Sequence, residues 1–223
     1  PHQDIMINLV GGLNVINASL KAKVKKLVFI SSGGTVYGTP QYIPITENHP
    51  TNPICSYGIN KLGVEKYCYL YKEIYDLNVV ILRLANPYGD RQRLVSSQGV
   101  VPAFLDRAIS GKSLEIWGDG STIRDFLYIS DVINAILQAC FYNGSEYIFN
   151  IGSGSGVSLN DLVRAIETEF HQSLDVIYKP SRGFDVPINV LCIKRAQSLL
   201  NWSPKISIAE GLSRFRSYLG SLH

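Results

Sequence analysis

Long apolar runs and metal-binding patterns are both missing from this chain of 223 residues. No uninterrupted apolar stretch approaches the roughly 18 residues that cross a bilayer, so the sequence predicts no membrane span. The four histidines (His2, His49, His171 and His223) show no ligand spacing, and we therefore expect no metal site. The 21 basic and 18 acidic residues give a net charge of +3, which is too balanced to indicate a nucleic-acid partner.

Cysteines are few and widely spaced. The four of them (Cys55, Cys68, Cys140 and Cys192) form no Cys-x-x-Cys motif, which favours free thiols and a reducing, cytoplasmic location. The hydrophobic content of 46% is ample for a buried core. It fits one large domain or two closely packed ones.

Apolar periodicity predicts alternating helices and strands along the chain. Helices are expected over 5–22, 54–75, 101–110, 129–142, 158–170 and 207–219, and strands over 26–31, 79–84, 147–151 and 176–178. The segment 38–53 carries four prolines and is expected to be a loop. Strands that alternate with helices indicate an α/β fold, and the apolar run at 79–84 is typical of a parallel sheet.

Tyr57 and Lys61 stand four residues apart, so they lie on one face of the helix expected there. A lysine ammonium at that spacing can stabilise a phenolate. Bringing a tyrosine pKa from near 10 to about 7 needs roughly 4 kcal/mol. The pair therefore predicts a tyrosine that exchanges a proton with a ligand hydroxyl near neutral pH. Without further motifs, a half-buried tyrosine beside a solvated lysine would explain the pattern equally well.

Polar and small residues follow two of the predicted strands. Ser31, Ser32 and Thr35 come after the first apolar run, and Asn86 comes after the run at 79–84. Ligands of open α/β sheets bind at the carboxyl ends of the strands. The sequence thus predicts a site where these residues meet the Tyr57 helix.

Several motifs in a fixed order extend this pattern along nearly the whole chain. They are Asn8-x-x-Gly11, Ser31-Ser32-Gly33-Gly34-Thr35-Val36-Tyr37-Gly38, Tyr57-x-x-x-Lys61, Arg83-Leu84-Ala85-Asn86-Pro87, Trp117-Gly118-Asp119-Gly120-Ser121-x-x-Arg124-Asp125-Phe126, Asn150-Ile151-Gly152, Arg182-Gly183-Phe184-Asp185-Val186-Pro187 and Leu200-Asn201-Trp202-Ser203-Pro204. Together they resemble the extended short-chain dehydrogenase/reductase family, in particular its nucleotide-sugar epimerases of the UDP-glucose 4-epimerase type.

The resemblance implies a partial Rossmann-type parallel sheet flanked by helices over residues 1–96. Residues 97–223 would form mainly a small substrate-binding α/β subdomain, with some segments returning to the sheet. The implied activity is NAD-dependent 4-epimerisation of a UDP-hexose or UDP-N-acetylhexosamine through a 4-keto intermediate. Members of the family are commonly homodimers, and we expect the same here.

The resemblance also assigns roles to individual residues. The catalytic set is Tyr57 and Lys61 with a hydroxyl from Thr35 or, second, Ser32, and the NAD contacts are Asn8, Ser31, Tyr57, Lys61 and Ala85. The substrate contacts are Asn86, Val100, Glu115, Trp117, Arg124, Arg182, Asp185 and Asn189. The two arginines suit a pyrophosphate because a guanidinium binds it with two parallel hydrogen bonds.

The chain departs from the family in lacking its opening strand and Gly-x-x-Gly-x-x-Gly turn, which bind the NAD pyrophosphate. The turn Gly152-Ser153-Gly154-Ser155-Gly156 is expected to belong to the substrate side instead. We expect the strand at 26–31 to be an exposed edge that another segment or chain covers. We also expect the chain alone to bind NAD poorly and to turn over little substrate.

The second departure lies at Gly33, where the family usually has its catalytic serine or threonine. A 4,6-dehydratase would be expected to show Thr-Asp-Glu before Val36, whereas this chain has Gly33-Gly34-Thr35, which favours an epimerase. A decarboxylase or reductase of the same fold, and a non-catalytic nucleotide-sugar-binding protein, remain alternatives.

Overall fold

The computed structural model describes residues 2–92, 99–183 and 186–221. In chain order its elements are α1 (His2–Asp4), the π-helix η1 (Ile5–Val10), α2 (Gly11–Lys21), β1 (Leu27–Ser32), α3 (Ser56–Tyr75), β2 (Val79–Leu84), β3 (Asn86–Tyr88), α4 (Val100–Ser110), β4 (Leu114–Trp117), β5 (Ile123–Arg124), β6 (Phe126–Tyr128), α5 (Ile129–Phe141), β7 (Ile148–Ile151), β8 (Val157–Ser158), α6 (Leu159–Phe170), β9 (Val176–Lys179), β10 (Ile188–Asn189), α7 (Lys194–Leu199) and α8 (Ile208–Gly220).

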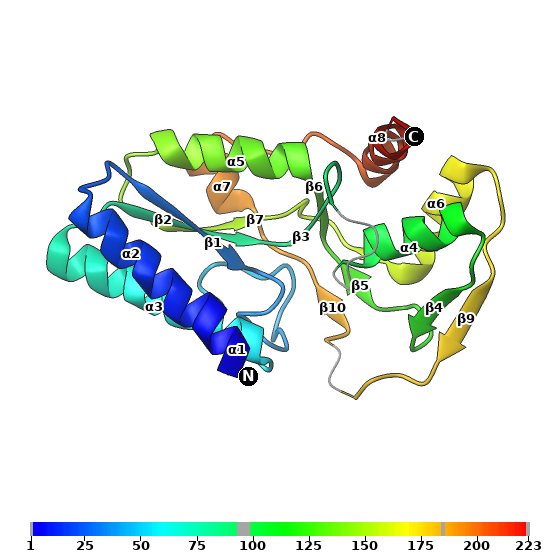
Figure 1. The fold of residues 1–223 in the computed structure, drawn as a ribbon, viewed down its shortest axis with the longest axis horizontal. Helices are drawn as coiled ribbons and strands as arrows, with labels where there is room; N and C mark the ends of the chain where they lie inside the picture. Colours follow the sequence, from blue (N-terminus) through cyan, green and yellow to red (C-terminus); the bar gives the residue numbers. More distant parts are fainter. Residues whose placement is uncertain (1, 93–98, 184–185, 222–223) are drawn as a thin grey trace.

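The larger sheet is parallel, with strand order β1-β2-β7. Helices α2 and α3 cover one face and α5 and α7 the other (Figure 1). Side chains of the fully buried β2 alternate between these faces, so that Val79 and Ile81 pack toward α2 and α3, and Val80 and Leu82 toward α5 and α7. This explains why the sequence of β2 is nearly all apolar.

β1 lies at the edge of this sheet, since among the described strands it pairs with β2 alone. The residues Leu27–Ile30 are only partly buried, in contrast to the neighbouring β2. The sequence led us to expect such an edge, and its unpaired backbone groups favour pairing with a further strand.

α3 packs closely against α2 and η1 at two glycines. A Cβ atom on Gly12 would lie 2.7 Å from Val64 Cγ2, and one on Gly63 would lie 2.9 Å from Leu9 Cδ1. The helix predicted over 5–22 is present but begins with the π-turns of η1, a rare geometry.

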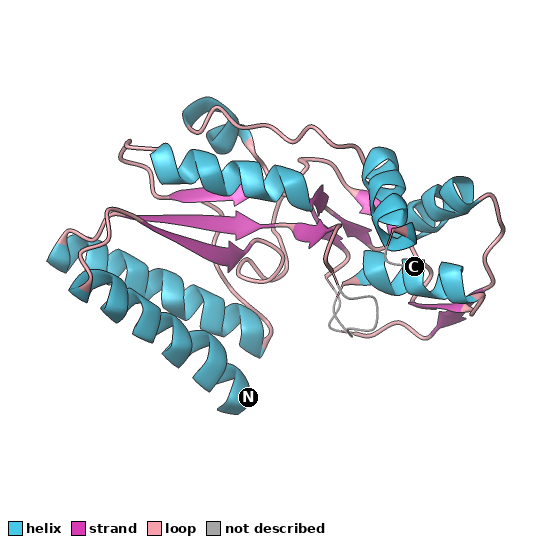
Figure 2. Ribbon diagram, turned by 45° about the horizontal axis from the view of Figure 1, so that its top comes forward, coloured by secondary structure: helices cyan, strands magenta, loops and turns pink. Residues whose placement is uncertain are grey.

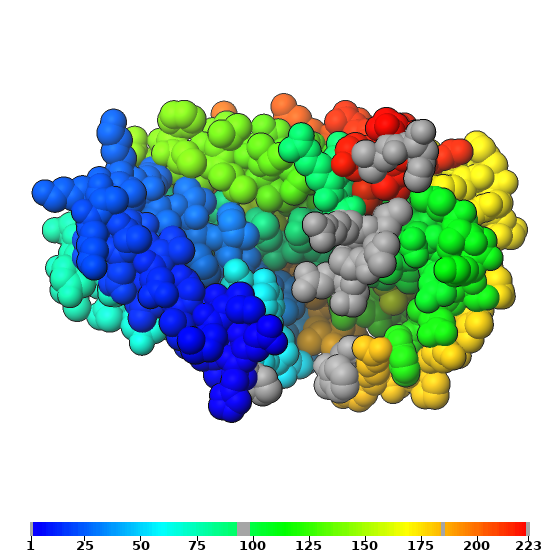
Figure 3. Space-filling model, viewed as in Figure 1, coloured from blue at the N-terminus to red at the C-terminus, as the bar shows by residue number. Residues whose placement is uncertain are grey.

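The second core lies between α4, α6 and α8 and the short strands near them. β4 pairs with β9, β3 with β6, and β5 lies between β10 and β8. Figure 2 shows these short strands beside the larger sheet, and in Figure 3 the blue and lime residues of α2 and α5 fill one half of the molecule while the green-to-gold residues of α4, α6 and β9 fill the other. The predicted domain boundary near residue 96 stays a prediction.

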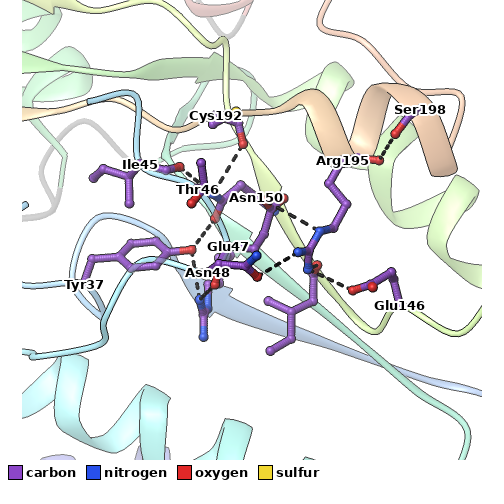
Figure 4. A network of polar contacts seen from close by, with 12 residues as sticks. Tyr37, Ile45, Thr46, Glu47, Asn48, Glu146, Asn150, Cys192, Arg195 and Ser198 are labelled. Atoms are coloured by element: carbon purple, nitrogen blue, oxygen red, sulfur yellow. Dashed lines mark hydrogen bonds and ion pairs between the residues drawn. The ribbon is translucent and has the colours of Figure 1, made fainter. Parts of the chain in front are cut away.

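A polar network joins the loop at 38–53 to β7 and α7 (Figure 4). Tyr37 Oη donates to Asn150 Oδ1 at 2.7 Å, and Asn150 Nδ2 donates to Ile45 O at 2.8 Å. Glu47 accepts from Asn150 N at 3.0 Å and lies 3.8 Å from Arg195 Nε. The motif residues Tyr37 and Asn150 therefore hold the loop against the sheet.

The predicted α/β class with a parallel sheet is confirmed, and most predicted elements lie within two residues of their expected bounds. The short strands β3, β4, β5, β6, β8 and β10 and the helix α7 were missed, because two to six residues carry too little periodicity. Within the described residues, no helix is both long and apolar enough to span a bilayer. All four cysteines are free thiols.

Candidate active site

Helix α3 carries Tyr57 and Lys61 in its first two turns. Cys55 caps the helix, its Sγ accepting from Gly58 N at 3.4 Å. A Cβ atom on Gly58 would lie 2.7 Å from Thr35 O, so this glycine lets α3 approach the turn that follows β1. Lys61 Nζ donates to Ile30 O at 2.9 Å and lies 5.6 Å from the centre of the Tyr57 ring. The pair thus stands over the carboxyl end of β1.

Burial shifts the pKa values of both Tyr57 and Lys61. Burial raises the pKa of the phenol above its ordinary value of 10.0, and the nearby Asp4 and Cys55 act in the same direction. Burial also lowers the pKa of the Lys61 ammonium. A lowered Tyr57 pKa, which would also need the charge of a bound nicotinamide, stays a prediction; in the chain by itself burial raises this pKa, and the lysine lies 5.6 Å from the ring centre.

A cavity of about 610 Å³ opens beside Tyr57, and we call it the active-site cavity. Its lining residues are Ile30, Ser31, Ser32, Gly34, Thr35, Tyr57, Leu84, Ala85, Asn86, Pro87, Gln92, Gly99 and Arg124. They come from β1 and the turn after it, from the start of α3, from the end of β2 with the adjoining β3, from the segments beside Gln92 and Gly99, and from β5. The structure thus brings together the predicted catalytic hydroxyls, the predicted NAD contacts Ser31 and Ala85, and two predicted substrate contacts.

The two glycines after Ser32 differ in their surroundings. A Cβ atom on Gly33 would lie 2.5 Å from Leu191 Cδ1 and 3.1 Å from Arg83 O, so the packing leaves no room for a side chain there. At Gly34 the nearest atom would be Ser32 Oγ at 4.0 Å, and this residue lines the cavity. A serine in the family's usual position would therefore require Leu191 to move.

Thr35 is the better placed of the two candidate hydroxyls. Both Thr35 and Ser32 line the active-site cavity. Thr35 Oγ1 is buried, and no described residue hydrogen bonds to it. Buried hydroxyls in native structures nearly always have a partner, so this atom is available to a ligand.

Two predicted NAD contacts already have partners. Ser31 Oγ donates to Glu65 Oε1, and Glu65 also pairs with Arg83. Asn8 lies outside the active-site cavity, and its Nδ2 donates to Asp4 Oδ1 at 2.6 Å. Ser31 therefore lines the cavity with its hydroxyl already paired, whereas Asn8 lies on the helix η1 and does not line the cavity.

Asn86 and Arg124 also line the active-site cavity. Asn86 Nδ2 donates to Asp125 O at 2.9 Å, and Arg124 Nη1 donates to Ile123 O at 2.9 Å. Neighbouring backbone thus orients both side chains.

Trp117 and Arg182 line a second cavity of about 850 Å³. The Arg182 guanidinium carbon lies 4.1 Å from the centre of the Trp117 ring, a cation–π contact on the surface. Glu115 lies next to this cavity on β4, 3.7 Å from Lys179 Nζ. A flat ring beside two cations is suited to a base and its phosphates.

Two further predicted substrate contacts, Val100 and Asn189, line neither cavity. Val100 packs against the core at the start of α4. Asn189 is 1% exposed and lies behind Gly33, where its Nδ2 donates to Gly33 O at 3.3 Å. Asp185 lies outside the described residues.

Gln92 is a cavity residue that sequence reasoning missed. It lines the active-site cavity, and its Oε1 is buried without a partner among the described residues. It follows the turn Tyr88-Gly89-Asp90-Arg91, where no periodicity marks a direction for the side chain. The sequence signal that could have indicated Gln92 as a site residue was its closeness to Asn86, which it follows by six positions.

The glycine turn at 152–156 has a structural role. The buried Asp125 carboxylate accepts from Ser153 N at 2.7 Å, from Gly154 N at 3.3 Å and from Leu191 N at 3.2 Å. The turn therefore wraps a carboxylate of the chain itself, which leaves no room for a phosphate. No group of three or more potential metal ligands occurs in the part of the chain that the structure describes.

Comparison with known proteins identifies a family and several relatives of this chain. The family described as NAD dependent epimerase/dehydratase matches residues 1–152. A UDP-glucose 4-epimerase of Mycolicibacterium smegmatis is 35% identical over 214 residues, covering 96% of this chain and 68% of that protein. A dTDP-4-dehydro-6-deoxyglucose reductase of Escherichia coli is 35% identical over 196 residues, covering 85% of this chain and 60% of that protein.

The fold matches a crystal structure of UDP-glucose 4-epimerase from Thermotoga maritima, which contains UDP-glucose. The TM-score is 0.95 at 36% sequence identity, and the match covers 100% of this chain and 72% of that one. The chain thus spans between 60% and 72% of the length of these three proteins.

Proposed function

The chain belongs to the NAD-dependent epimerase/dehydratase family, and on that premise we propose that its activity is NAD-dependent 4-epimerisation of a UDP-hexose or UDP-N-acetylhexosamine. The resemblance drawn from the sequence motifs is confirmed for the family, and NAD is the cofactor of that family. The observation that carries the proposal is the cavity in which Tyr57, Thr35, Asn86 and Arg124 meet.

Residues at the active-site cavity fit the nicotinamide end of NAD. The small residues Gly34 and Ala85 leave space on the wall, and Lys61 holds the carboxyl end of β1 beneath Tyr57. Tyr57, Lys61, Ser31 and Ala85 would hold that end. The chemistry that NAD supplies is reversible hydride transfer, which carries a sugar through a 4-keto form.

The remaining chemistry comes from the side chains. Tyr57 would exchange a proton with the 4-hydroxyl of the sugar, and Thr35 Oγ1 would hydrogen bond to the same oxygen. Positive charge beside the phenol, from Lys61 and from a bound nicotinamide cation, would favour the phenolate. Ser32 is the second candidate for the hydroxyl.

The nucleotide would extend from Asn86 and Arg124 toward the second cavity. Arg124 and Arg182 are then the candidates for the two phosphates, and Trp117 with the nearby Glu115 backbone for the base. Asp185 stays a candidate for the ribose, and Val100 and Asn189 would act indirectly, by shaping the cavity from behind. We further propose a cytoplasmic homodimer, or a partner segment that covers the edge of β1.

A second candidate is reduction of a 4-keto nucleotide sugar. The E. coli relative is named as a reductase acting on such a sugar. In that reaction Tyr57 would give its proton to the developing 4-hydroxyl.

The test has two parts. Titration calorimetry with UDP-glucose and UDP-N-acetylglucosamine measures substrate binding, and the release of NAD on denaturing the purified chain measures cofactor retention. With NAD added in excess, since we expect the chain alone to bind it poorly, the turnover that remains at C4 should depend on Tyr57, so that Tyr57→Phe loses it and keeps substrate binding. Failure of the wild-type chain to bind either nucleotide sugar would overturn the proposal, and reduction of a 4-keto sugar without epimerisation would favour the second candidate.

A further inference from the structure

The side-chain oxygen of Gln92 is a buried acceptor without a donor. Gln92 lines the active-site cavity together with Thr35, Tyr57 and Arg124. Its Oε1 is buried, and no described residue donates to it. Unpaired buried acceptors cost free energy and are rare in native proteins. Such an atom in a cavity wall indicates a ligand that supplies the donor.

The backbone around Gln92 fixes the position of this amide. Gln92 N donates to Gly89 O at 3.2 Å, which closes a turn. Gly89 has φ +133°, and a Cβ atom there would lie 2.8 Å from Tyr128 Cε2. A Cβ atom on Gly99 would lie 3.0 Å from Gln92 Nε2, so the amide is packed against the residue that precedes α4. The acceptor is therefore held in place before any ligand arrives.

The chemistry of the wall selects the kind of donor. An amide oxygen accepts hydrogen bonds and donates none. Asn86 lines the same cavity, and because its Nδ2 donates to Asp125 O, its amide oxygen is a second acceptor there. Two amide oxygens beside the hydroxyl groups of Thr35 and Ser32 suit a ligand with several O–H or N–H donors, as a hexose or an acetamido sugar has.

We propose that Gln92 Oε1 accepts a hydrogen bond from the sugar part of the nucleotide sugar and that Gln92 thereby determines which sugar binds. This inference rests on the proposed function, because it assigns a contact within the same site. It adds a residue that recognises the sugar, whereas Trp117 and Arg182 belong to the cavity proposed for the nucleotide.

The experiment compares UDP with UDP-glucose and UDP-N-acetylglucosamine as ligands in titration calorimetry. Gln92→Met keeps the length of the side chain and removes the acceptor. We expect about a tenfold loss of affinity for the sugar that donates to Gln92, with the affinity for UDP unchanged. Gln92→Glu keeps an acceptor and should retain more of that affinity than Gln92→Met. The matched control is Gln138→Met at an exposed position of α5, which should change neither affinity.

Each outcome has one reading. Equal losses for UDP and both UDP-sugars in Gln92→Met, or no loss at all, would show that Gln92 does not contact the sugar and would overturn the inference alone. A wild-type chain that binds neither UDP nor a UDP-sugar would overturn the proposed function, and the inference with it. If circular dichroism shows that Gln92→Met does not fold, Gln92→Asn is used in its place. Its amide is one methylene shorter and should no longer reach the sugar, so we expect the same selective loss of affinity.

Discussion

Two sets of buried polar groups meet at the carboxyl end of β1 and differ in how fully they are hydrogen bonded. On one side, Arg83 donates to both oxygens of Glu65 and to Tyr37 Oη, and Tyr37 in turn donates to Asn150. On the other, the cavity-wall atoms Thr35 Oγ1 and Gln92 Oε1 have no partner among the described residues.

This difference separates groups that hold the fold from groups that are available to a ligand. Removing one member of the satisfied network leaves its partners buried without hydrogen bonds, so the cost falls on stability. Removing an atom that has no partner leaves no other buried group unpaired, so the cost falls on ligand binding or turnover and not on stability. Each substitution below tests one side of that division.

The largest effect is expected at the ion pair between Arg83 and Glu65, whose nitrogen and oxygen lie 2.6 Å apart with 4% and 3% of the side chains exposed. Glu65→Leu leaves the guanidinium buried without its counter-charge and should lower the free energy of unfolding by about 3–5 kcal/mol. Urea denaturation measures this. Arg214→Ala, which breaks an exposed pair with Glu210, is the control and should cost less than about 1 kcal/mol. A Glu65→Leu protein as stable as that control would contradict the structural role of the network.

Alkaline pH should weaken the same network next. Burial raises the pKa of Tyr37 to about 12, while an unfolded tyrosine titrates near 10. Between these values the unfolded chain loses the proton first, so the free energy of unfolding falls as pH rises from 10 to 12 and is unaffected below 10. Tyr37 contributes about 1.4 kcal/mol per pH unit to this loss, or roughly 2–3 kcal/mol in total, and the buried Tyr88 and Tyr128, whose pKa values are also raised, add to it.

Urea titrations at pH 9, 10, 11 and 12 measure that slope. Tyr37→Phe lowers stability at every pH, because Arg83 and Asn150 lose a partner, but it should flatten the slope above pH 10. An unchanged slope in Tyr37→Phe would mean that other tyrosines cause the alkaline loss.

Local sequence patterns were sufficient for much of the fold. The apolar run of β2 predicted a doubly buried strand, and Ser158 predicted the start of α6, where its Oγ accepts from Asp161 N at 3.0 Å. The spacing of Tyr57 and Lys61 predicted one helix face. In each case residues within one helical turn or one strand determine the structure, so a single sequence contains the information.

The candidate site was harder to predict where contacts join distant parts of the chain. Gly33 is closed off by Leu191, which lies 158 positions later, and Gln92 reaches the cavity through a turn without periodicity. The rise in the Tyr57 pKa of the chain by itself was not foreseen, because sequence does not reveal how strongly a phenol is buried. The split of the substrate contacts between two cavities likewise depends on tertiary packing.

The adjacent glycines Gly33 and Gly34 allow a smaller, paired test. Gly33→Ala should cost about 1–3 kcal/mol, because its Cβ would meet Leu191 and the Arg83 carbonyl in a packed region. Gly34→Ala should change stability by less than about 1 kcal/mol, since the nearest atom would be 4.0 Å away. Thermal or urea unfolding of both variants gives the comparison.

Leu191→Ala tests whether the contact with Leu191 causes the stability loss of Gly33→Ala. If the contact with Leu191 causes the loss, Gly33→Ala should cost clearly less in the Leu191→Ala background than in the wild type. Equal costs in both backgrounds would assign the strain to the Arg83 carbonyl instead, and equal costs at Gly33 and Gly34 would remove the distinction between them.

The smallest effect on stability is expected at Thr35, and it is the sharpest test of the comparison. Thr35→Val keeps the shape of the side chain and removes a buried hydroxyl that no described residue hydrogen bonds. Stability should therefore stay within about 0.5 kcal/mol of the wild type or rise slightly, because no partner is left unpaired. Turnover of the nucleotide sugar should nevertheless fall, by roughly the 10²–10³-fold typical of losing one hydrogen bond to a reacting oxygen, and Thr35→Ser should restore it.

The two readouts for Thr35 must be made on the same preparations, by urea unfolding and by a C4 epimerisation assay with added NAD. A structural hydroxyl would show the opposite pattern, with stability lost and turnover retained in the folded fraction. Ser32→Ala is the matched comparison, since Ser32 lines the same cavity. Loss of turnover in Ser32→Ala with full activity in Thr35→Val would transfer the catalytic hydroxyl to Ser32, and the unpartnered atom at Thr35 would then need another ligand group to explain it.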